Sequence, residues 1–189
     1  MKKALLLVTL LATIGAAQAQ SATYAIDPTH TAVTFEAKHF GTSTLRGRWD
    51  KKEGTVTLDK AAKTGKVEFT IDMASISTGT APFDGHLKSK DFFAVEEFPT
   101  AKFVGDKFTF NGDKVTSVSG ELTLKGKTNP VTLTATGFGC YENPRLKREV
   151  CGGDFETTIQ RSQWGITYAM PAVTPDAIRL LIQVEAIKQ

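Results

Sequence analysis

Apolar and polar residues alternate with a period of two along most of the chain after its first 20 residues. In residues 33–38, Val33, Phe35 and Ala37 share one face and polar side chains share the other. The same alternation recurs at 67–72, 117–125 and 178–185. Successive side chains of a strand point to opposite faces of a sheet, so each segment is predicted to be a half-buried β-strand.

Further runs of apolar and β-branched residues predict more strands. They lie at 44–50, 53–58, 101–110, 127–138 and 155–160. Turn-forming residues separate the runs, for example Asn111-Gly112-Asp113 and Gly152-Gly153-Asp154. About eight strands at short intervals predict an all-β, single-domain protein, built as an antiparallel β-barrel or a sandwich.

One segment, residues 81–95, departs from this alternation. Its apolar residues include Phe83, Leu87 and the pair Phe92-Phe93, at spacings that suit one or two short helical turns. A helical segment among strands is expected to lie at one end of the barrel, where it could act as a lid.

The first 19 residues have the pattern of a secretory signal peptide. Lys2-Lys3 precedes an apolar run at 4–16, and Ala17-Gln18-Ala19 offers a small-residue cleavage site. The run is shorter than the roughly 20 apolar residues of a membrane-spanning helix. We therefore expect residues 1–19 to be removed and residues 20–189 to form one exported, soluble domain.

Charge adds an expectation about partners. Loss of Lys2 and Lys3 with the signal peptide leaves 21 of the 23 basic residues against 20 acidic ones. A nearly neutral chain lacks the excess of basic side chains that binds phosphate backbones, so no nucleic-acid partner is predicted.

The chain has two cysteines, Cys140 and Cys151, on either side of the charged segment 141–150. In an oxidising compartment they are expected to form a disulfide, which stabilises by about 3 kcal/mol through loop closure. A metal site would need two more ligands at suitable spacing, and none is recognised nearby, so no metal is predicted.

Three histidines, His30, His39 and His86, are the candidates for a catalytic base or a metal site. Their spacing matches no ligand motif. His39 has the inward parity of the strand at 33–38, which favours a hydrogen-bonded histidine at a barrel mouth. No catalytic residue is therefore predicted.

Phenylalanine is enriched in the middle of the chain. Seven of the 12 phenylalanines lie between Phe83 and Phe110. A small eight-stranded barrel has room for side chains alone or for one slender ligand. Periodicity and composition therefore leave two interpretations open, a filled core and a ligand tunnel.

Five segments, in this order, carry a family resemblance: DPTHTAVTFEAKH at 27–39, RGRW at 46–49, SKDFFAVEEFPTAKF at 89–103, GELTLKG at 120–126 and RSQWG at 161–165. Together they resemble the YceI-like family of secreted polyisoprenoid-binding proteins, over nearly all of the chain after the signal peptide. The resemblance implies an extended, lipocalin-like antiparallel barrel with an apolar tunnel for an isoprenoid or similar long-chain lipid. It also implies a binding protein without catalytic residues or cofactors, resident in the periplasm of a Gram-negative bacterium.

The chain departs from the family pattern at two places. Trp164 stands where the family usually has phenylalanine, and the cysteine-closed segment 140–151 is not a general family feature. Both departures bear on the shape of the mouth or tunnel, and hence on which ligand is bound.

The residues predicted to bind the ligand fall into two groups. The apolar group, expected to contact the tail, contains Phe35, Ala37, Trp49, Phe69, Ile71, Phe83, Leu87, Phe92, Phe93, Leu122, Trp164, Leu180 and Ile182. The polar group, expected near a head group, contains His39, His86 and Arg161. For Arg161, a structural salt bridge is favoured over contact with a head group.

The predicted function is a periplasmic carrier or reservoir for a polyisoprenoid, an isoprenoid quinone or a polyprenyl phosphate, or for a fatty amide or acid. Two alternatives remain. One is a solid-core barrel that docks on a membrane partner through the basic segment Arg145-Leu146-Lys147-Arg148. The other is an enzyme that acts on a lipid head group through His30, His39 or His86. Transient membrane contact and a homodimer formed through strand edges also stay open.

Overall fold

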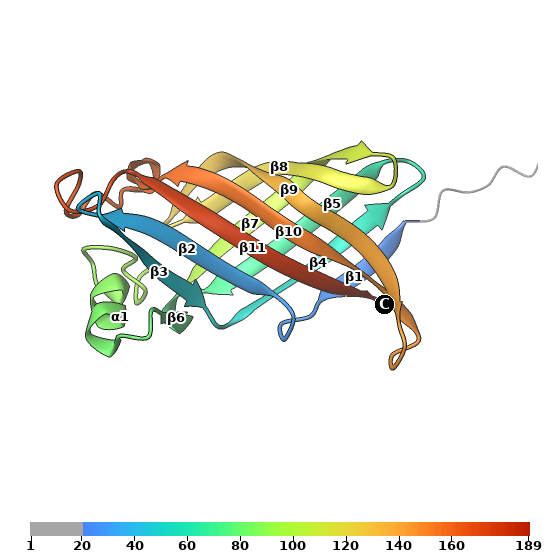
Figure 1. Ribbon diagram of the computed structural model, residues 1–189, viewed down its shortest axis with the longest axis horizontal. Helices are drawn as coiled ribbons and strands as arrows, with labels where there is room; N and C mark the ends of the chain where they lie inside the picture. The colour runs from blue at the N-terminus through green and yellow to red at the C-terminus, as the bar shows by residue number, and fades with distance from the viewer. Residues whose placement is uncertain (1–20) are drawn as a thin grey trace, which may run out of the picture.

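Eleven antiparallel strands form one sheet in the computed structural model, which describes residues 21–189 (Figure 1). The predicted signal peptide, residues 1–19, lies outside the described residues. The strands are β1 (Ala22–Ile26), β2 (Ala32–His39), β3 (Ser43–Trp49), β4 (Lys52–Asp59), β5 (Thr64–Asp72), β6 (Ile76–Ser77), β7 (Thr100–Asn111), β8 (Lys114–Leu124), β9 (Lys127–Asn143), β10 (Arg148–Gln160) and β11 (Ala177–Lys188). The helical segments are α1 (Ala81–Lys88) and the short 3₁₀ helices η1 (Met73–Ser75) and η2 (Arg161–Trp164).

The sheet closes into a barrel because β1 pairs on both of its sides. Ala22 lies opposite Leu58 of β4, and Ile26 lies opposite Ala186 of β11. The closed ring is β1, β4, β5, β7, β8, β9, β10 and β11. The predicted fold class, an antiparallel barrel of about eight strands with short helical segments, is confirmed.

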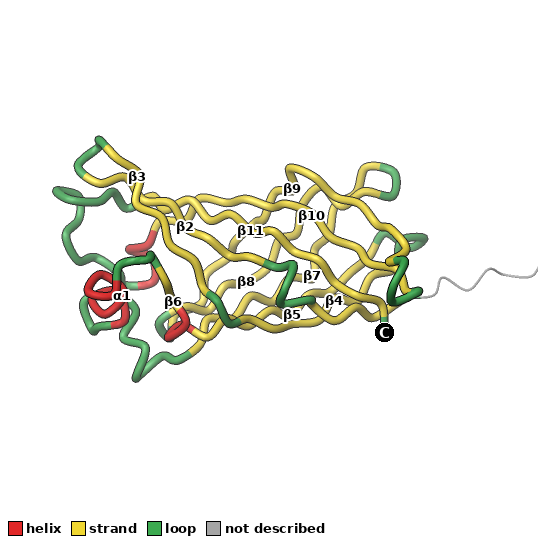
Figure 2. The backbone as a smooth tube through the Cα atoms, turned by 60° about the horizontal axis from the view of Figure 1, so that its bottom comes forward, coloured by secondary structure: helices red, strands yellow, loops and turns green. Residues whose placement is uncertain are grey.

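β2 continues along β11 from the point where β1 stops. Ile26 pairs with Ala186, and Val33 pairs with Ile182 further along the same strand. β3 then pairs with β2, and the short β6 pairs with β3. These strands extend the barrel wall towards the end that carries α1 (Figure 2).

The turn between β1 and β2 is held by side chains of the first family segment. Asp27 accepts hydrogen bonds from the Thr29 amide at 2.9 Å, from the Thr29 hydroxyl at 2.6 Å and from His30 Nδ1 at 2.7 Å. Such local hydrogen bonds are typical of Asx turns. This motif therefore has a structural role on the barrel surface.

The position of two glycines inside β10 shows that one prediction from the sequence was wrong. Gly152-Gly153-Asp154 was predicted to be a turn, but it lies inside β10. A Cβ at Gly152 would lie 2.1 Å from the Val184 carbonyl oxygen, and one at Gly153 would lie 2.0 Å from that of Gly137. The register shifts directly afterwards, between Asp154 and Phe155, so the glycines allow close strand approach at a β-bulge.

The segment between the cysteines is part of a β-hairpin. Cys140 of β9 lies directly opposite Cys151 of β10, and the two form the predicted disulfide. The strands continue past them to Asn143 and Arg148, so the charged segment is mostly strand rather than loop. This hairpin projects from the end of the barrel opposite α1 (Figure 1).

The helical segment predicted within 81–95 is confirmed as α1 and the turns that follow it. Asp84 accepts hydrogen bonds from the Thr78 amide at 2.7 Å and the Thr78 hydroxyl at 2.6 Å, which fixes the start of α1 against the preceding chain. Leu87 is buried, and its carbonyl accepts a hydrogen bond from the Phe93 amide. The segment is thereby folded back against one end of the barrel.

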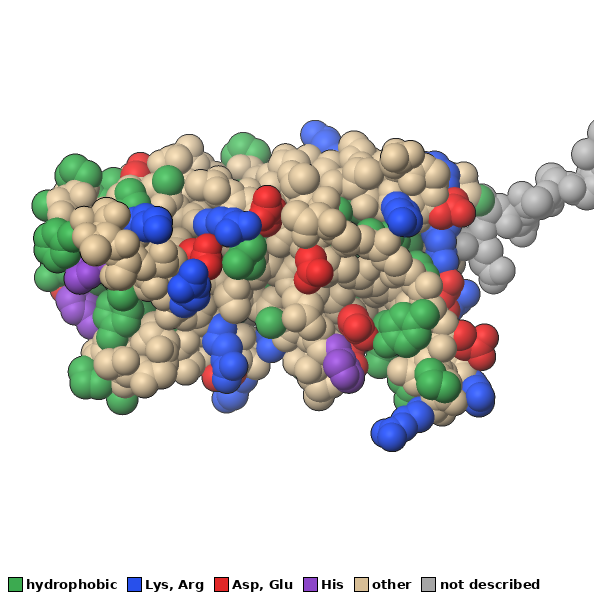
Figure 3. Space-filling model, in the orientation of Figure 1, with side chains coloured by type: hydrophobic (Ala, Val, Ile, Leu, Met, Phe, Trp, Pro, Cys, Tyr) green, Lys and Arg blue, Asp and Glu red, His purple; other side chains and the backbone are tan. Residues whose placement is uncertain are grey.

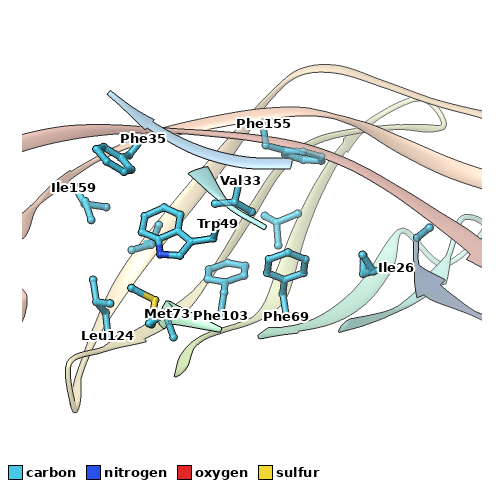
Figure 4. Close-up of a cluster of buried hydrophobic side chains, with 14 of the residues drawn as sticks. Ile26, Val33, Phe35, Trp49, Phe69, Met73, Phe103, Leu124, Phe155 and Ile159 are labelled. Carbon is cyan, nitrogen blue, oxygen red and sulfur yellow. The ribbon is translucent and has the colours of Figure 1, made fainter. Parts of the chain in front are cut away.

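The inward faces of the strands supply the core. Val33 and Phe35 of β2 and Phe69 of β5 are buried, as their alternation predicts. Figure 4 shows these side chains converging with Trp49 and Phe103 from neighbouring strands. The interior of the barrel is therefore apolar from several sides.

Candidate ligand tunnel

The barrel interior holds two adjoining cavities. The first, here called the far chamber, has a volume of about 150 Å³ and is lined by residues such as Tyr24 and Phe155. The second, here called the α1 chamber, has a volume of about 270 Å³ and is lined by Leu87 of α1. Four residues line both chambers and form the waist between them: Val33, Ile71, Leu122 and Leu180.

Most of the residues predicted to bind a ligand line this interior. Those that line the α1 chamber alone are Phe35, Ala37, His39, Trp49, Phe83, His86, Leu87, Phe92, Phe93 and Arg161. Ile71, Leu122 and Leu180 lie at the waist, and Phe69 and Ile182 line the far chamber. The inward-facing strand residues and the aromatic residues of segment 81–95 thus line one interior surface.

Trp164 is the predicted ligand-binding residue that lines neither chamber. Its side chain is 1 % exposed, and its Nε1 donates a hydrogen bond of 3.0 Å to the Leu122 carbonyl. The indole ring therefore fixes η2 against β8 from behind the waist.

Some lining residues were missed by sequence reasoning. Tyr24 and Ile26 line the far chamber from β1, a strand of five residues that was not predicted from the sequence. Tyr168 and Val173 line the α1 chamber from the segment 165–176, which has no regular pattern. Period two could have found the β1 residues, but nothing local in the sequence marks the others.

Apolar side chains line the far chamber. The polar hydroxyl of Tyr24, one of its lining residues, forms a hydrogen bond outside the chamber. Tyr24 is 1 % exposed, and its hydroxyl donates a hydrogen bond of 2.6 Å to Glu149. Burial, together with this hydrogen bond, raises the pKa of Tyr24 above its ordinary value. Lys60 pairs with the same carboxylate at 2.5 Å. The chamber thus offers a ligand an apolar surface and no free charge.

Arg161 is the charged residue of the α1 chamber. It is 5 % exposed, and its Nε and Nη2 donate to the carbonyls of Pro175 at 3.1 Å and Tyr168 at 2.9 Å. Nη2 also donates to the Thr174 hydroxyl at 2.8 Å. Burial lowers the pKa of the guanidinium, which Asp176 partly offsets, but arginine remains charged in proteins.

The structural salt bridge favoured for Arg161 from the sequence is not found among the described residues, so that prediction is wrong. Within residues 21–189 no carboxylate lies close enough to pair with it. Its bonds go to neutral oxygens of the segment 168–175, because that segment wraps around the guanidinium. The positive charge is therefore buried without a negative partner in the described part of the chain.

The histidines do not assemble a metal centre in the described structure. His30 is bound to Asp27 in the β1–β2 turn, whereas His39 and His86 line the α1 chamber. Among residues 21–189, one group of three potential ligands lies close enough to hold an ion, and it is Cys140, Glu149 and Cys151. Both sulfurs of that group are in the disulfide.

The fold and the interior define a class: an extended antiparallel β-barrel with two adjoining, mainly apolar chambers. The YceI-like domain matches residues 24–186, and the chain belongs to this family. The predicted family membership is confirmed. Among the described residues, no helix has the length and apolar composition to cross a membrane.

Relatives match most of this chain. A UPF0312 protein of Pseudomonas putida strain W619 is 35 % identical over 181 residues, covering 94 % of this chain and 93 % of its own. A UPF0312 protein of Pseudomonas aeruginosa strain LESB58 is 36 % identical over 177 residues, covering 92 % and 91 %.

Solved structures share the fold. BcnA of Burkholderia cenocepacia matches with a TM-score of 0.71 and 24 % identity, over 85 % of this chain and 98 % of BcnA. The YceI protein of Campylobacter jejuni matches with a TM-score of 0.69 and 26 % identity, over 80 % and 90 %. A polyisoprenoid binding domain from Saccharophagus degradans matches with a TM-score of 0.63 and 13 % identity, over 88 % and 98 %.

Proposed function

We propose that this protein binds a long-chain isoprenoid lipid inside its barrel and serves as a periplasmic carrier or reservoir for it. The observation that carries the proposal is the predominantly apolar lining of the far chamber, the waist and the α1 chamber. The polyisoprenoid binding domain of S. degradans, which has the same fold, supports the choice of lipid. The signal-like residues 1–19 support the periplasmic location.

The dimensions of the interior suit a slender chain. Lining residues of β11 run from Ile178 at the α1 chamber to Ala186 at the far chamber. At about 3.3 Å per residue and a strand tilt of roughly 40°, this stretch spans about 20 Å of the barrel axis. Leu122 and Leu180 line both chambers, so a single hydrocarbon chain that occupied both would lie against these two side chains.

Burial of the chain supplies the driving force for binding. Removing each CH₂ group from water contributes about 0.8 kcal/mol before ordering costs. The closed ring of paired strands holds the backbone of the barrel wall in place before a ligand enters. Two real chambers also argue against the alternative in which the barrel has a solid core.

A binding role also fits the polar groups better than catalysis does. His39 and His86 share the α1 chamber with Arg161, and Asp91 lies 3.7 Å from His86 Nε2, beyond the distance at which a carboxylate hydrogen-bonds and orients a histidine base. A carrier needs only a cavity of suitable shape with apolar walls. The enzymatic alternative therefore has no arrangement of residues to support it in this chamber.

The test is native mass spectrometry of the protein purified from the periplasm of a Gram-negative host. We expect one adduct with the mass of an isoprenoid lipid, released by organic solvent. Leu180→Trp should fill the waist and reduce the adduct, whereas Leu181→Trp places the same ring one residue along β11, on the outward face. A bare protein mass in wild type, from hosts that contain the lipid, would refute the carrier role.

A further inference from the structure

Three residues that line the α1 chamber each carry a buried polar atom without a hydrogen-bond partner. Within residues 21–189, Trp49 Nε1, His86 Nε2 and Arg161 Nη1 are fully buried and form no hydrogen bond. All three residues line this chamber, and none lines the far chamber. An unpaired buried polar atom costs about 1–3 kcal/mol, so three around one cavity indicate a partner that occupies it.

The chemistry of the three atoms defines that partner. Trp49 Nε1 and Arg161 Nη1 can only donate hydrogen bonds, and His86 Nε2 donates when it carries a proton. Asp91 lies 3.7 Å from His86 Nε2, beyond hydrogen-bond distance. Two of the three atoms can only donate, so a ligand group that satisfies this set must present hydrogen-bond acceptors.

The buried positive charge of Arg161 further restricts the kind of ligand group. The Arg161 guanidinium has no carboxylate partner among the described residues, and Asp176, the acidic residue whose charge bears on it most, is already bonded to the Ser162 amide and hydroxyl. The remaining contacts of Arg161 are neutral oxygens and the face of Phe92, 5.9 Å from its Cζ. A buried cation without a counter-charge favours an anionic ligand group.

The α1 chamber also has the contact with solvent that a charged group needs. Tyr168 lines it and is 46 % exposed, and the His86 side chain is 38 % exposed although its Nε2 is buried. Both rings pack together, 5.0 Å apart, beside Phe92. These residues lie at the α1 end of the barrel, where apolar side chains gather on the surface (Figure 3).

We propose that the α1 chamber binds an oxyanionic head group, a carboxylate or phosphate, through Arg161, Trp49 and His86, with the lipid tail directed through the waist into the far chamber. This inference rests on the proposed function and selects among the lipids that it allows. The polar end stays near the mouth formed by Tyr168 and His86. The far chamber, which has no unpaired polar atom of this kind among the described residues, holds the tail.

The test compares two probes with one tail, geranylgeranyl phosphate and geranylgeraniol, on the delipidated protein. Charge-assisted hydrogen bonds are the strong ones, so we expect the phosphate to bind at least about tenfold more tightly. Arg161→Gln should bring the two affinities to within about threefold of each other, mainly by weakening the phosphate. Arg179→Gln removes a guanidinium that pairs with Glu36 and Glu156 outside the tunnel, and it should leave the ratio unchanged.

Arg161 also holds the segment 168–175, so Arg161→Gln can fail to fold. Two further variants therefore test the head-group site independently of Arg161. Trp49→Phe and His86→Phe each remove one donor and keep a ring in place. Each should lower phosphate affinity several-fold and leave the alcohol nearly unchanged. A methyl ester of a long-chain acid, compared with its free acid, should show the same preference for the anion.

The outcomes separate this inference from the proposed function. Equal binding of phosphate and alcohol by wild type, or a phosphate preference that survives all three chamber variants, would overturn the head-group site and leave the carrier role intact. Failure of both probes, and of longer isoprenoid phosphates, would count against the carrier role itself.

Discussion

At the scale of single residues, inward parity does not by itself define a role. Phe35 and Trp49 both face the interior, and their rings lie 5.5 Å apart. Phe35 supplies only apolar surface, whereas Trp49, which also lines the α1 chamber, has a buried Nε1 without a hydrogen-bond partner. Trp164, the other tryptophan, lies outside both chambers, and its Nε1 donates a hydrogen bond to the Leu122 carbonyl.

Substitution of Trp164 should therefore change stability and not ligand binding. Trp164→Phe removes the hydrogen bond to Leu122 and leaves a small void, so we expect a loss of about 1–3 kcal/mol in the free energy of unfolding. Urea denaturation measures the loss, and titration with geranylgeraniol measures the affinity. A change of affinity without a change of stability would contradict the structural role.

At the scale of elements, the β1–β2 turn should respond to pH. The hydrogen bond to Asp27 raises the pKa of His30 above its ordinary value. Burial acts to raise the pKa of Asp27, but hydrogen bonds from Thr29 and His30 outweigh it and hold the value at about 2. Asp27 is thus ionised near neutral pH, and His30 alone titrates in this turn.

The sign of the effect follows from the raised pKa of His30. Its contribution to stability is fully present below the unfolded pKa of about 6.5 and is lost as pH rises through the higher folded value. Thermal unfolding should show a small decrease in the melting temperature of wild type between about pH 6 and pH 8. His30→Gln should reduce this slope, and an unchanged slope would mean that the pair contributes nothing.

The disulfide should stabilise the β9–β10 hairpin without shaping the tunnel mouth. Replacing both Cys140 and Cys151 by serine should reduce the free energy of unfolding by about 2–3 kcal/mol, since the closed loop is short. The α1 chamber lies at the other end of the barrel, so the ratio of phosphate to alcohol affinity should not change. Denaturation under oxidising and reducing conditions, with the double variant as reference, measures both effects.

Alternation predicts most of the strands because each buries one face, as in β2, β5 and β11. It fails where backbone geometry determines the choice of residue. Gly152 and Gly153 have the composition of a turn, but they form a bulge inside β10. It also gives no sign of the segment 165–176, which lines the α1 chamber with Tyr168 and encloses Arg161. The polar environment of Arg161 is tertiary, so the unpaired Nη1 could not be predicted from the sequence.

At the scale of the whole molecule, the barrel has two unlike ends. The α1 end carries the larger chamber, the unpaired donors and the partly exposed Tyr168. The opposite end carries the disulfide hairpin, and there Tyr24, Glu149 and Lys60 form a polar network against the far chamber. A lipid that binds head-outward at α1 would therefore have a tunnel of limited depth for its tail.

Limited depth predicts how affinity depends on chain length. With a phosphate head held in the α1 chamber, each added isoprene unit should increase affinity while it enters the waist and the far chamber, at about 0.8 kcal/mol gross per CH₂ equivalent. Once the tail fills roughly 20 Å of the axis, further units should add little. Calorimetry with geranyl, farnesyl, geranylgeranyl and longer phosphates measures the series. Because Leu180→Trp narrows the waist, its plateau should come at a shorter chain than in Leu181→Trp; identical curves for the two variants would place the tail elsewhere.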